Sequence, residues 1–311
     1  PELSVSLGEL VRSELVFRRG TPPDAIYSFK NALVQDAAYA SLLKSRRLEL
    51  HARIAAVLED HFPETIATEP EVLAHHLSQA GLGHAVEYWR KAGEIAVQRS
   101  ANIEAIAHFS KALEALATQP DSSARSEQEF ALQMAVAVPL VATKGISGTE
   151  VEQAYSRAQA LSEEQGKLDQ VFPVFRGLWN CYLARGETQR AHDLAVRISA
   201  QAAAHDEPLH RALAHRALGS SLFFLGRFAE SLDETDQAVA IDDALDGSDG
   251  ERTQLFLYGE RPGIIARLYG GWALWFLGFP DRAVARFDAA IALAEKLGHA
   301  YSLAFALTFA A

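Results

Sequence analysis

The sequence lacks several features that would place it in other protein classes. Its 311 residues include one cysteine, Cys181, so no internal disulfide can form. No run of about 18 uninterrupted apolar residues is present, although a membrane-spanning helix needs about that length. The first residues also lack the charged and apolar regions of a secretory signal peptide. These absences predict a cytoplasmic protein that makes no contact with a membrane.

Motifs for cofactor chemistry are missing as well. There is no G-x-x-x-x-G-K-S/T loop, whose backbone amides and lysine hold phosphates, and no G-x-S-x-G elbow. The segment from Gly81 to Val86 begins like a dinucleotide fingerprint but lacks the third small residue and the preceding strand. We therefore expect neither a cofactor nor catalysis in this segment.

The charges are unevenly distributed along the chain. The formal net charge is −11. Residues 1–62 hold equal numbers of basic and acidic side chains, so residues 63–311 carry the whole acidic excess. Because nucleic-acid binding relies on Lys and Arg to neutralise phosphates, we expect no nucleic acid as a partner. The net neutrality of residues 1–62 argues against DNA binding by the N-terminal part as well.

Residues 1–62 predict a small winged-helix-like module. Residues 15–19 and 26–30 are β-prone runs joined by a turn rich in Gly and Pro. Helical apolar spacing precedes this hairpin and follows it as far as Phe62. The order helix, hairpin, helix is typical of the end of a winged-helix domain.

Residues 63–311 predict an all-α repeat array. Alanine-rich helical segments alternate with short loops that contain Gly, Pro, Asp or Ser. Small residues recur where the paired helices of a tetratricopeptide (TPR) repeat would touch, and the clearest copy contains Trp89, Ala92, Gly93, Ala96, Ala105, Phe109 and Ala112. Later copies have turn glycines at Gly186, Gly226 and Gly278, spaced more widely than the usual ~34 residues. We expect a degenerate TPR-like superhelix, an α-solenoid, after the winged-helix-like module.

Two strings in the sequence resemble a known family. One runs from Tyr27 to Leu43 and continues at Arg46-Arg47-Leu-Glu-Leu-His51, and the other is Ala85-Val-Glu-Tyr-Trp89-Arg-Lys-Ala-Gly93. They resemble the winged-helix and TPR region of bacterial signalling proteins that join a class III adenylate/guanylate cyclase domain, an AAA/STAND ATPase and TPR repeats. Asn31 departs from the family, which usually has His there.

The resemblance implies a regulatory role without catalytic residues in this stretch. ATP and Mg²⁺ would bind only in upstream domains, and those ATPase and cyclase domains would be partners in cis. The chain starts without Met and ends within an apolar helical pattern, so we expect further sequence on both sides. The expected function is a non-catalytic sensor and protein-interaction segment of such a signalling protein.

Two alternatives remain open. The chain could instead be the effector-sensing region of an ATPase–TPR transcriptional regulator. It could also be an all-α metal-dependent enzyme, in which Asp242, Asp243 and Asp246 would hold Mg²⁺ through carboxylate oxygens. The favoured interpretation of these aspartates is a solvated loop between repeats.

The candidate binding surface follows from the TPR template. First-helix side chains line the concave face, where aromatic residues and Arg suit an unknown protein or peptide partner. This predicts a groove formed by Arg176, Asn180, Leu183, Arg216, Ser220, Phe223, Leu268, Trp272 and Trp275. Trp272 and Trp275 could equally fill contacts between repeats. Cys181 is expected to be a small buried side chain.

Overall fold

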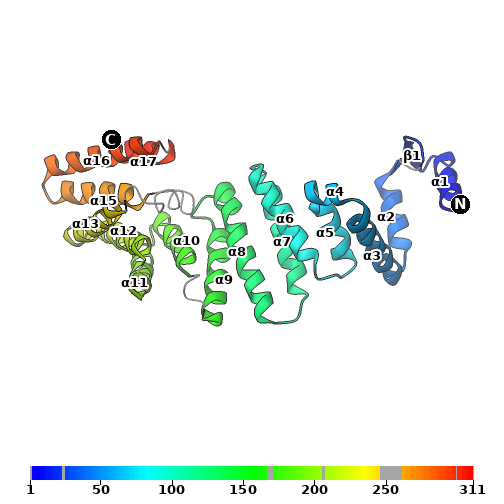
Figure 1. Cartoon of the computed structure of the whole chain (residues 1–311), viewed down its shortest axis with the longest axis horizontal. Coiled ribbons are helices and arrows are strands. Elements are labelled where there is room, and N and C mark those ends of the chain that lie inside the picture. The colour runs from blue at the N-terminus through cyan, green and yellow to red at the C-terminus, as the bar shows by residue number, and fades with distance from the viewer. Residues whose placement is uncertain are drawn as a thin grey trace. The chain divides into compact units, whose positions relative to one another are not determined.

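The protein is an all-α array of helices with one small hairpin near its N-terminus (Figure 1). The computed structural model describes residues 2–22, 25–166, 171–204, 207–245, 261–298 and 300–310. These residues form sixteen α-helices and a two-stranded antiparallel sheet. Two compact units are present, Pro1–Ile95 with Lys111–Gln119 and Ala96–Ser110 with Pro120–Ala311.

The first unit begins with the expected order of helix, hairpin and helix. Its elements are α1 (Glu2–Arg12), β1 (Val16–Arg19), β2 (Ile26–Phe29), α2 (Ala32–Ser41), α3 (Lys44–His61), α4 (Pro63–Thr68) and α5 (Pro70–Gln79). In the hairpin, Val16 lies opposite Phe29 and Arg19 opposite Ile26. Helix α3 packs against α4 and α5, so the boundary predicted after residue 62 lies inside this unit and stays a prediction.

Asn31 has a structural role at the start of α2. Its side-chain oxygen accepts a hydrogen bond from the backbone N–H of Leu33 at 2.8 Å. This is an N-cap, which satisfies one of the backbone donors that a helix leaves unpaired at its start. The residue that departs from the family pattern therefore stabilises the helix that follows the hairpin.

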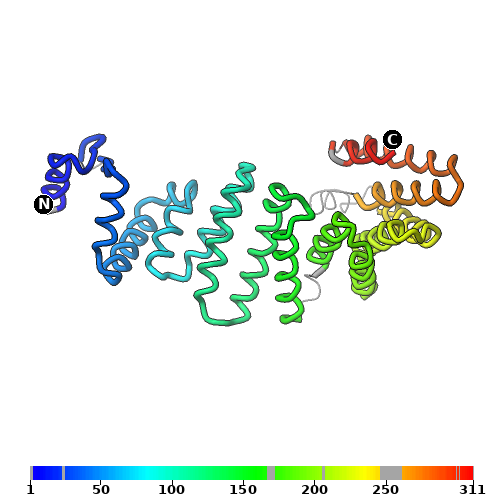
Figure 2. The backbone as a smooth tube through the Cα atoms, turned by 180° about the vertical axis from the view of Figure 1, so that it is seen from behind, coloured from blue at the N-terminus to red at the C-terminus, as the bar shows by residue number. Residues whose placement is uncertain are grey.

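The second unit consists of packed antiparallel helices (Figures 1 and 2). Helices α6 (Ala85–Gln98) and α7 (Asn102–Ala117) contribute to both units. The later helices are α8 (Ser123–Lys144), α9 (Thr149–Gln165), α10 (Val171–Ala184), α11 (Thr188–Ala204), α12 (Pro208–Phe224), α13 (Phe228–Ala244), α15 (Pro262–Phe276), α16 (Pro280–Leu297) and α17 (Ala300–Ala310). Each consecutive pair from α8/α9 to α16/α17 is in contact, and this includes α13 and α15. Helix α12 also packs on α15. The loop between α13 and α15 lies outside the described residues.

The turn glycines lie where the sequence predicts them. Gly186, Gly226 and Gly278 have φ angles of 73°, 75° and 88°, the left-handed region that favours glycine. Each follows a first helix and reverses the chain into the second helix of a pair. The TPR-like pairing of helices is thereby confirmed at three turns.

Small residues allow the paired helices to approach closely. A Cβ atom on Gly219 of α12 would come within 2.6 Å of Thr235 Cγ2 on α13. A Cβ on Gly271 of α15 would lie 2.4 Å from the ring of Phe287 on α16. On the second helices α13 and α16, the alanines Ala238, Ala283 and Ala290 are fully buried. Close packing at these positions excludes even one additional methyl group without movement of a neighbour.

Among the described helices, none combines the length and the hydropathy that crossing a bilayer requires.

Candidate interaction surface

The nine candidate residues lie on three first helices, α10, α12 and α15. Helix α12 contacts both α10 and α15, so these three helices follow one another within the second unit. The nine side chains differ in burial. Arg216 is 3% exposed, and Ser220 and Leu268 are fully buried, so these three reach no partner directly in this structure. Of the nine, only Trp275 is largely exposed, at 52%.

Arg216 contacts a buried tryptophan between α10 and α12. Its guanidinium carbon lies 4.8 Å from the centroid of the Trp179 ring, a cation–π geometry. The Trp179 indole N–H donates to Ser221 Oγ at 2.8 Å, and Ser221 Oγ donates to the Ala217 carbonyl at 2.8 Å. Because Arg216 lies on α12 and Trp179 on α10, this contact joins neighbouring repeats.

The two candidate tryptophans of α15 have different environments. The Trp272 indole N–H donates to the Phe309 carbonyl of α17 at 3.0 Å, and its ring lies edge-on to Phe287 at 5.8 Å. Trp272 therefore fills a contact between repeats. Trp275 lies near the end of the same helix, where half of its surface faces solvent.

Phe223 belongs to a group of five aromatic side chains, here called the aromatic cluster: Phe223, Phe224, Phe228, Tyr269 and Phe276. The Phe223 ring centroid lies 5.4–5.9 Å from the other four. Phe228 and Phe276 are stacked at 4.8 Å with an interplanar angle of 7°. Phe224 and Phe276 are 51% and 57% exposed. The cluster thus presents aromatic surface to solvent.

Sequence reasoning selected Phe223 but missed the other four members. They come from the end of α12, the start of α13 and from α15, so helical spacing does not connect them. For Phe224, Phe228 and Phe276 a usable signal was their position, two residues from the turn glycines Gly226 or Gly278. Tyr269 has no such neighbour. Residues that flank successive turns meet at the same end of a repeat array.

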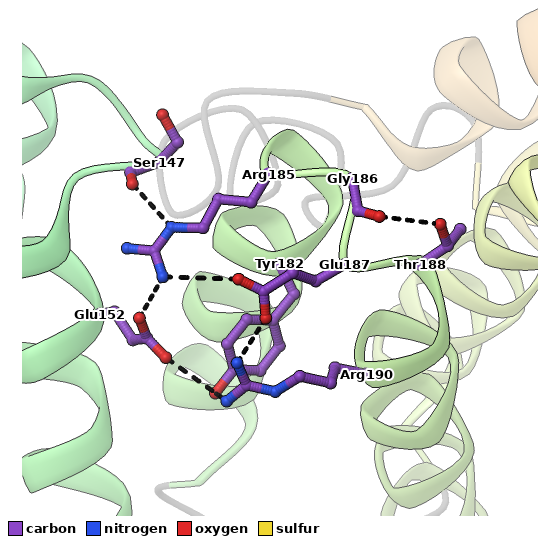
Figure 3. Close-up of polar contacts among 8 residues, drawn as sticks. All are labelled: Ser147, Glu152, Tyr182, Arg185, Gly186, Glu187, Thr188 and Arg190. Carbon is purple, nitrogen blue, oxygen red and sulfur yellow. Dashed lines mark hydrogen bonds and ion pairs between the residues drawn. The ribbon is translucent and has the colours of Figure 1, made fainter.

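A group of polar residues, separate from the aromatic cluster, connects α9 to the turn between α10 and α11 (Figure 3). The Arg185 Nε–H donates to the Ser147 carbonyl at 2.8 Å, and its guanidinium forms an ion pair with Glu152. Arg190 forms ion pairs with Glu152 at 3.4 Å and with Glu187, and donates to the Tyr182 hydroxyl at 3.0 Å. The positive charges of the two arginines are neutralised by the negative charges of the two glutamates. We therefore assign this group to packing between repeats.

The acidic run predicted as an alternative metal site is paired with arginines. Asp242 is fully buried and accepts from the Arg261 Nε–H at 2.8 Å, while Asp243 accepts from Arg267 at 2.5 and 2.7 Å. Burial raises the pKa of Asp242, and the positive charge of Arg261 opposes that rise. Asp246 lies outside the described residues. Across those residues, no three His, Cys, Asp or Glu side chains are placed to hold a metal ion.

Cys181 is fully buried, as predicted. Burial raises the pKa of its thiol, which keeps the side chain protonated and unreactive at neutral pH. Sequence reasoning offered no role for the histidines, but the structure brings several of them together in the first unit. His51 Nδ1 lies 2.8 Å from His76 Nδ1, and the Tyr39 hydroxyl lies 3.0 Å from His51 Nε2. These three side chains link α2, α3 and α5.

Comparisons with known proteins agree with the helical repeat architecture. No protein-family model matches the chain. The uncharacterized protein R02095 of Rhizobium meliloti (strain 1021) is 24% identical over 301 residues. That match covers 96% of this chain and 29% of the other protein, so the chain spans less than a third of its relative's length.

Several solved structures have a similar fold. The TPR-like repeats of a kinesin light chain from Podosopora anserina match with a TM-score of 0.54 and 16% identity, over 70% of this chain and 97% of that one. Aspartyl phosphate phosphatase F from Bacillus subtilis matches with a TM-score of 0.57 and 15% identity, over 88% and 71% of the two chains. A Rap protein complexed with Competence and Sporulation Factor matches with a TM-score of 0.52 and 16% identity, over 98% and 80%. At these identities the likeness shows the fold, a TPR-like repeat array.

Proposed function

We propose that this chain is a non-catalytic protein-interaction segment that binds a protein or peptide through the aromatic cluster of its TPR-like repeats. The exposed faces of Phe224 and Phe276 carry this proposal. Aromatic side chains supply large contact area for little loss of conformational entropy, and they are enriched at protein interfaces. By contrast, the charged groups around Glu152 and Asp242 are already paired within the protein.

The fold also supports this proposal. One structural neighbour, a Rap protein, is described in complex with Competence and Sporulation Factor. A repeat array is suited to such binding because each repeat adds surface along an extended face. By analogy, we propose that the partner of this chain is a protein or a peptide.

We further propose that binding regulates a larger signalling protein with cyclase and ATPase domains. The strings around Tyr39 and Trp89 support this context. Regulation requires that the partner bind the active and inactive states with different affinity. If deletion of residues 63–311 from the full-length protein leaves its cyclase and ATPase rates unchanged, the regulatory role is wrong.

The binding role is tested with peptides selected from a random library on the intact chain. Fluorescence polarisation would compare the wild type with the Phe224→Ser/Phe276→Ser double variant. The matched control is Ile103→Ser, which removes an 80% exposed apolar side chain elsewhere. We expect the double variant to weaken binding at least tenfold, the loss typical of a central interface residue, and the control to have no effect. Equal affinities of the double variant and the control would contradict the proposal.

A further inference from the structure

A cavity lined by both polar and apolar side chains lies in the first unit, at the end of α5. It has a volume of about 520 Å³, which is within the usual range for small-ligand sites. Its lining comes from α5, the loop after it, α6 and the end of α7, and includes His75, Ser78, Gln79, Trp89, Lys111 and Glu114. We propose that this cavity binds a small anion, with a carboxylate or phosphate group, between Lys111 and His75.

The walls of the cavity are held in place by hydrogen bonds. The Trp89 indole N–H donates to Ser78 Oγ at 2.8 Å, which joins α6 to α5. The Gln119 side-chain N–H donates to the Gly83 carbonyl at 2.9 Å, which holds the loop after α5 against the end of α7. A cavity with such fixed walls is preorganised, so a ligand loses little free energy in ordering it.

Lys111 supplies the positive charge of the site. Its ammonium lies 4.5 Å from the centroid of the Trp89 ring and forms no ion pair with any described residue. Glu114 also lines the cavity, one helical turn further along α7. The indole positions the ammonium at the cavity, where its positive charge can pair with an incoming anion.

Hydrogen-bond donors complement this charge. Ser78 Oγ accepts from Trp89, so its own O–H remains able to donate to a ligand. The Gln79 amide lines the same cavity. A few polar groups that line a concave site fix the orientation of a bound ligand.

His75 couples the site to pH. It faces His51 on α3 at a ring-centroid distance of 5.7 Å, His76 on α5 at 5.4 Å, and Lys111 on α7. Burial and the charge of Lys111 lower the pKa of His75, so its ring is neutral near pH 7. A bound anion favours the protonated ring, and binding therefore takes up a proton. Affinity is expected to increase as the pH falls toward 6.

The test is a titration of the chain with sodium acetate or inorganic phosphate at constant ionic strength, followed by the NMR signal of the His75 ring. Acetate keeps its charge between about pH 6 and pH 8, so its pH dependence reports on the protein. Binding of phosphate alone would assign a phosphate ligand, and binding of acetate alone a carboxylate ligand. A His75 signal that moves with neither probe would overturn the proposal.

Three variants separate this site from general charge effects. Lys111→Met keeps the aliphatic stem over Trp89 but removes the charge, and we expect it to weaken binding at least tenfold. The control Lys91→Met removes a lysine of α6 that is already paired with Glu87 at 2.8 Å, and binding should be unchanged. His75→Gln, followed by calorimetry, should remove the pH dependence. Equal binding by the two lysine variants, or an unchanged pH dependence in His75→Gln, would show that the proposal is wrong.

Discussion

The contact between His51 and His76 predicts that the first unit is sensitive to acid. At 2.8 Å between the two Nδ1 atoms, one imidazole must donate its proton and the other must accept it. Protonation of both rings would place two N–H groups face to face. Burial, together with the neighbouring His51 and His75, lowers the pKa of His76 to about 4.

The size of the effect follows from this shift. In the unfolded chain His76 has its ordinary pKa of 6.5, so between pH 6.5 and about 4 the unfolded state binds more protons than the folded state. The contribution of the neutral His76 ring to the free energy of unfolding is therefore fully present above pH 6.5. It falls as the pH decreases through this window and levels off below about pH 4. One pKa unit is worth about 1.36 kcal/mol, which gives a ceiling of about 3.4 kcal/mol. Because the ring is partly exposed, solvent screening reduces this to roughly 1–2 kcal/mol.

Hydrogen exchange measured by mass spectrometry can detect this loss locally. After correction for the intrinsic exchange rate, protection of α3 and α5 should fall about 5- to 30-fold between pH 7 and pH 4.5, the equivalent of 1–2 kcal/mol. Peptides from α10 and α11 provide an internal reference. In His76→Asn, whose amide can replace the Nδ1 contact without titrating, most of this dependence should disappear.

A second variant makes the assay specific. His215→Asn removes a partly buried histidine that contacts Glu234 at 2.7 Å in the second unit, and the acid response of α3 and α5 should remain. If His76→Asn loses protection in acid to the same extent as the wild type, the histidine contact is not the cause.

Two further predictions concern packing inside the repeats. Gly219→Ala would place a methyl group against Thr235 and a backbone carbonyl. We expect it to lower the free energy of unfolding, measured with urea, by about 1–3 kcal/mol. Gly8→Ala in α1, with open space around it, should be neutral or slightly stabilising. Asp242→Ala removes the carboxylate that pairs with the buried Arg261. We expect the free energy of unfolding, measured from the urea midpoint, to fall by about 3–5 kcal/mol. A fall below about 1 kcal/mol would show that the pair contributes little to stability.

Much of the fold could be predicted from the sequence because its determinants are local. Helical apolar spacing gave the helices on both sides of the hairpin, and β-prone runs gave strands that differ by one residue at their ends from those observed. Gly186, Gly226 and Gly278 marked turns because glycine adopts a left-handed conformation without strain. Such signals depend on a few neighbouring residues.

The candidate surface could be predicted only in part. The TPR template identified the first helices α10, α12 and α15, but not which of their side chains face solvent. Arg216 became buried because it could stack on Trp179, and Trp272 because its indole reached the backbone of α17. Burial of this kind depends on the neighbouring helix, which the spacing within one helix does not describe.

The sequence by itself determined where helices begin, turn and pair, because backbone preferences and apolar periodicity act over a few residues. Only the tertiary structure decided that His51 meets His76 across 25 positions, that Asp242 pairs with Arg261, and that four aromatic rings from α12, α13 and α15 gather around Phe223. The physical reason is that a helix fixes the direction of each side chain, whereas its partner is set by how separate helices dock.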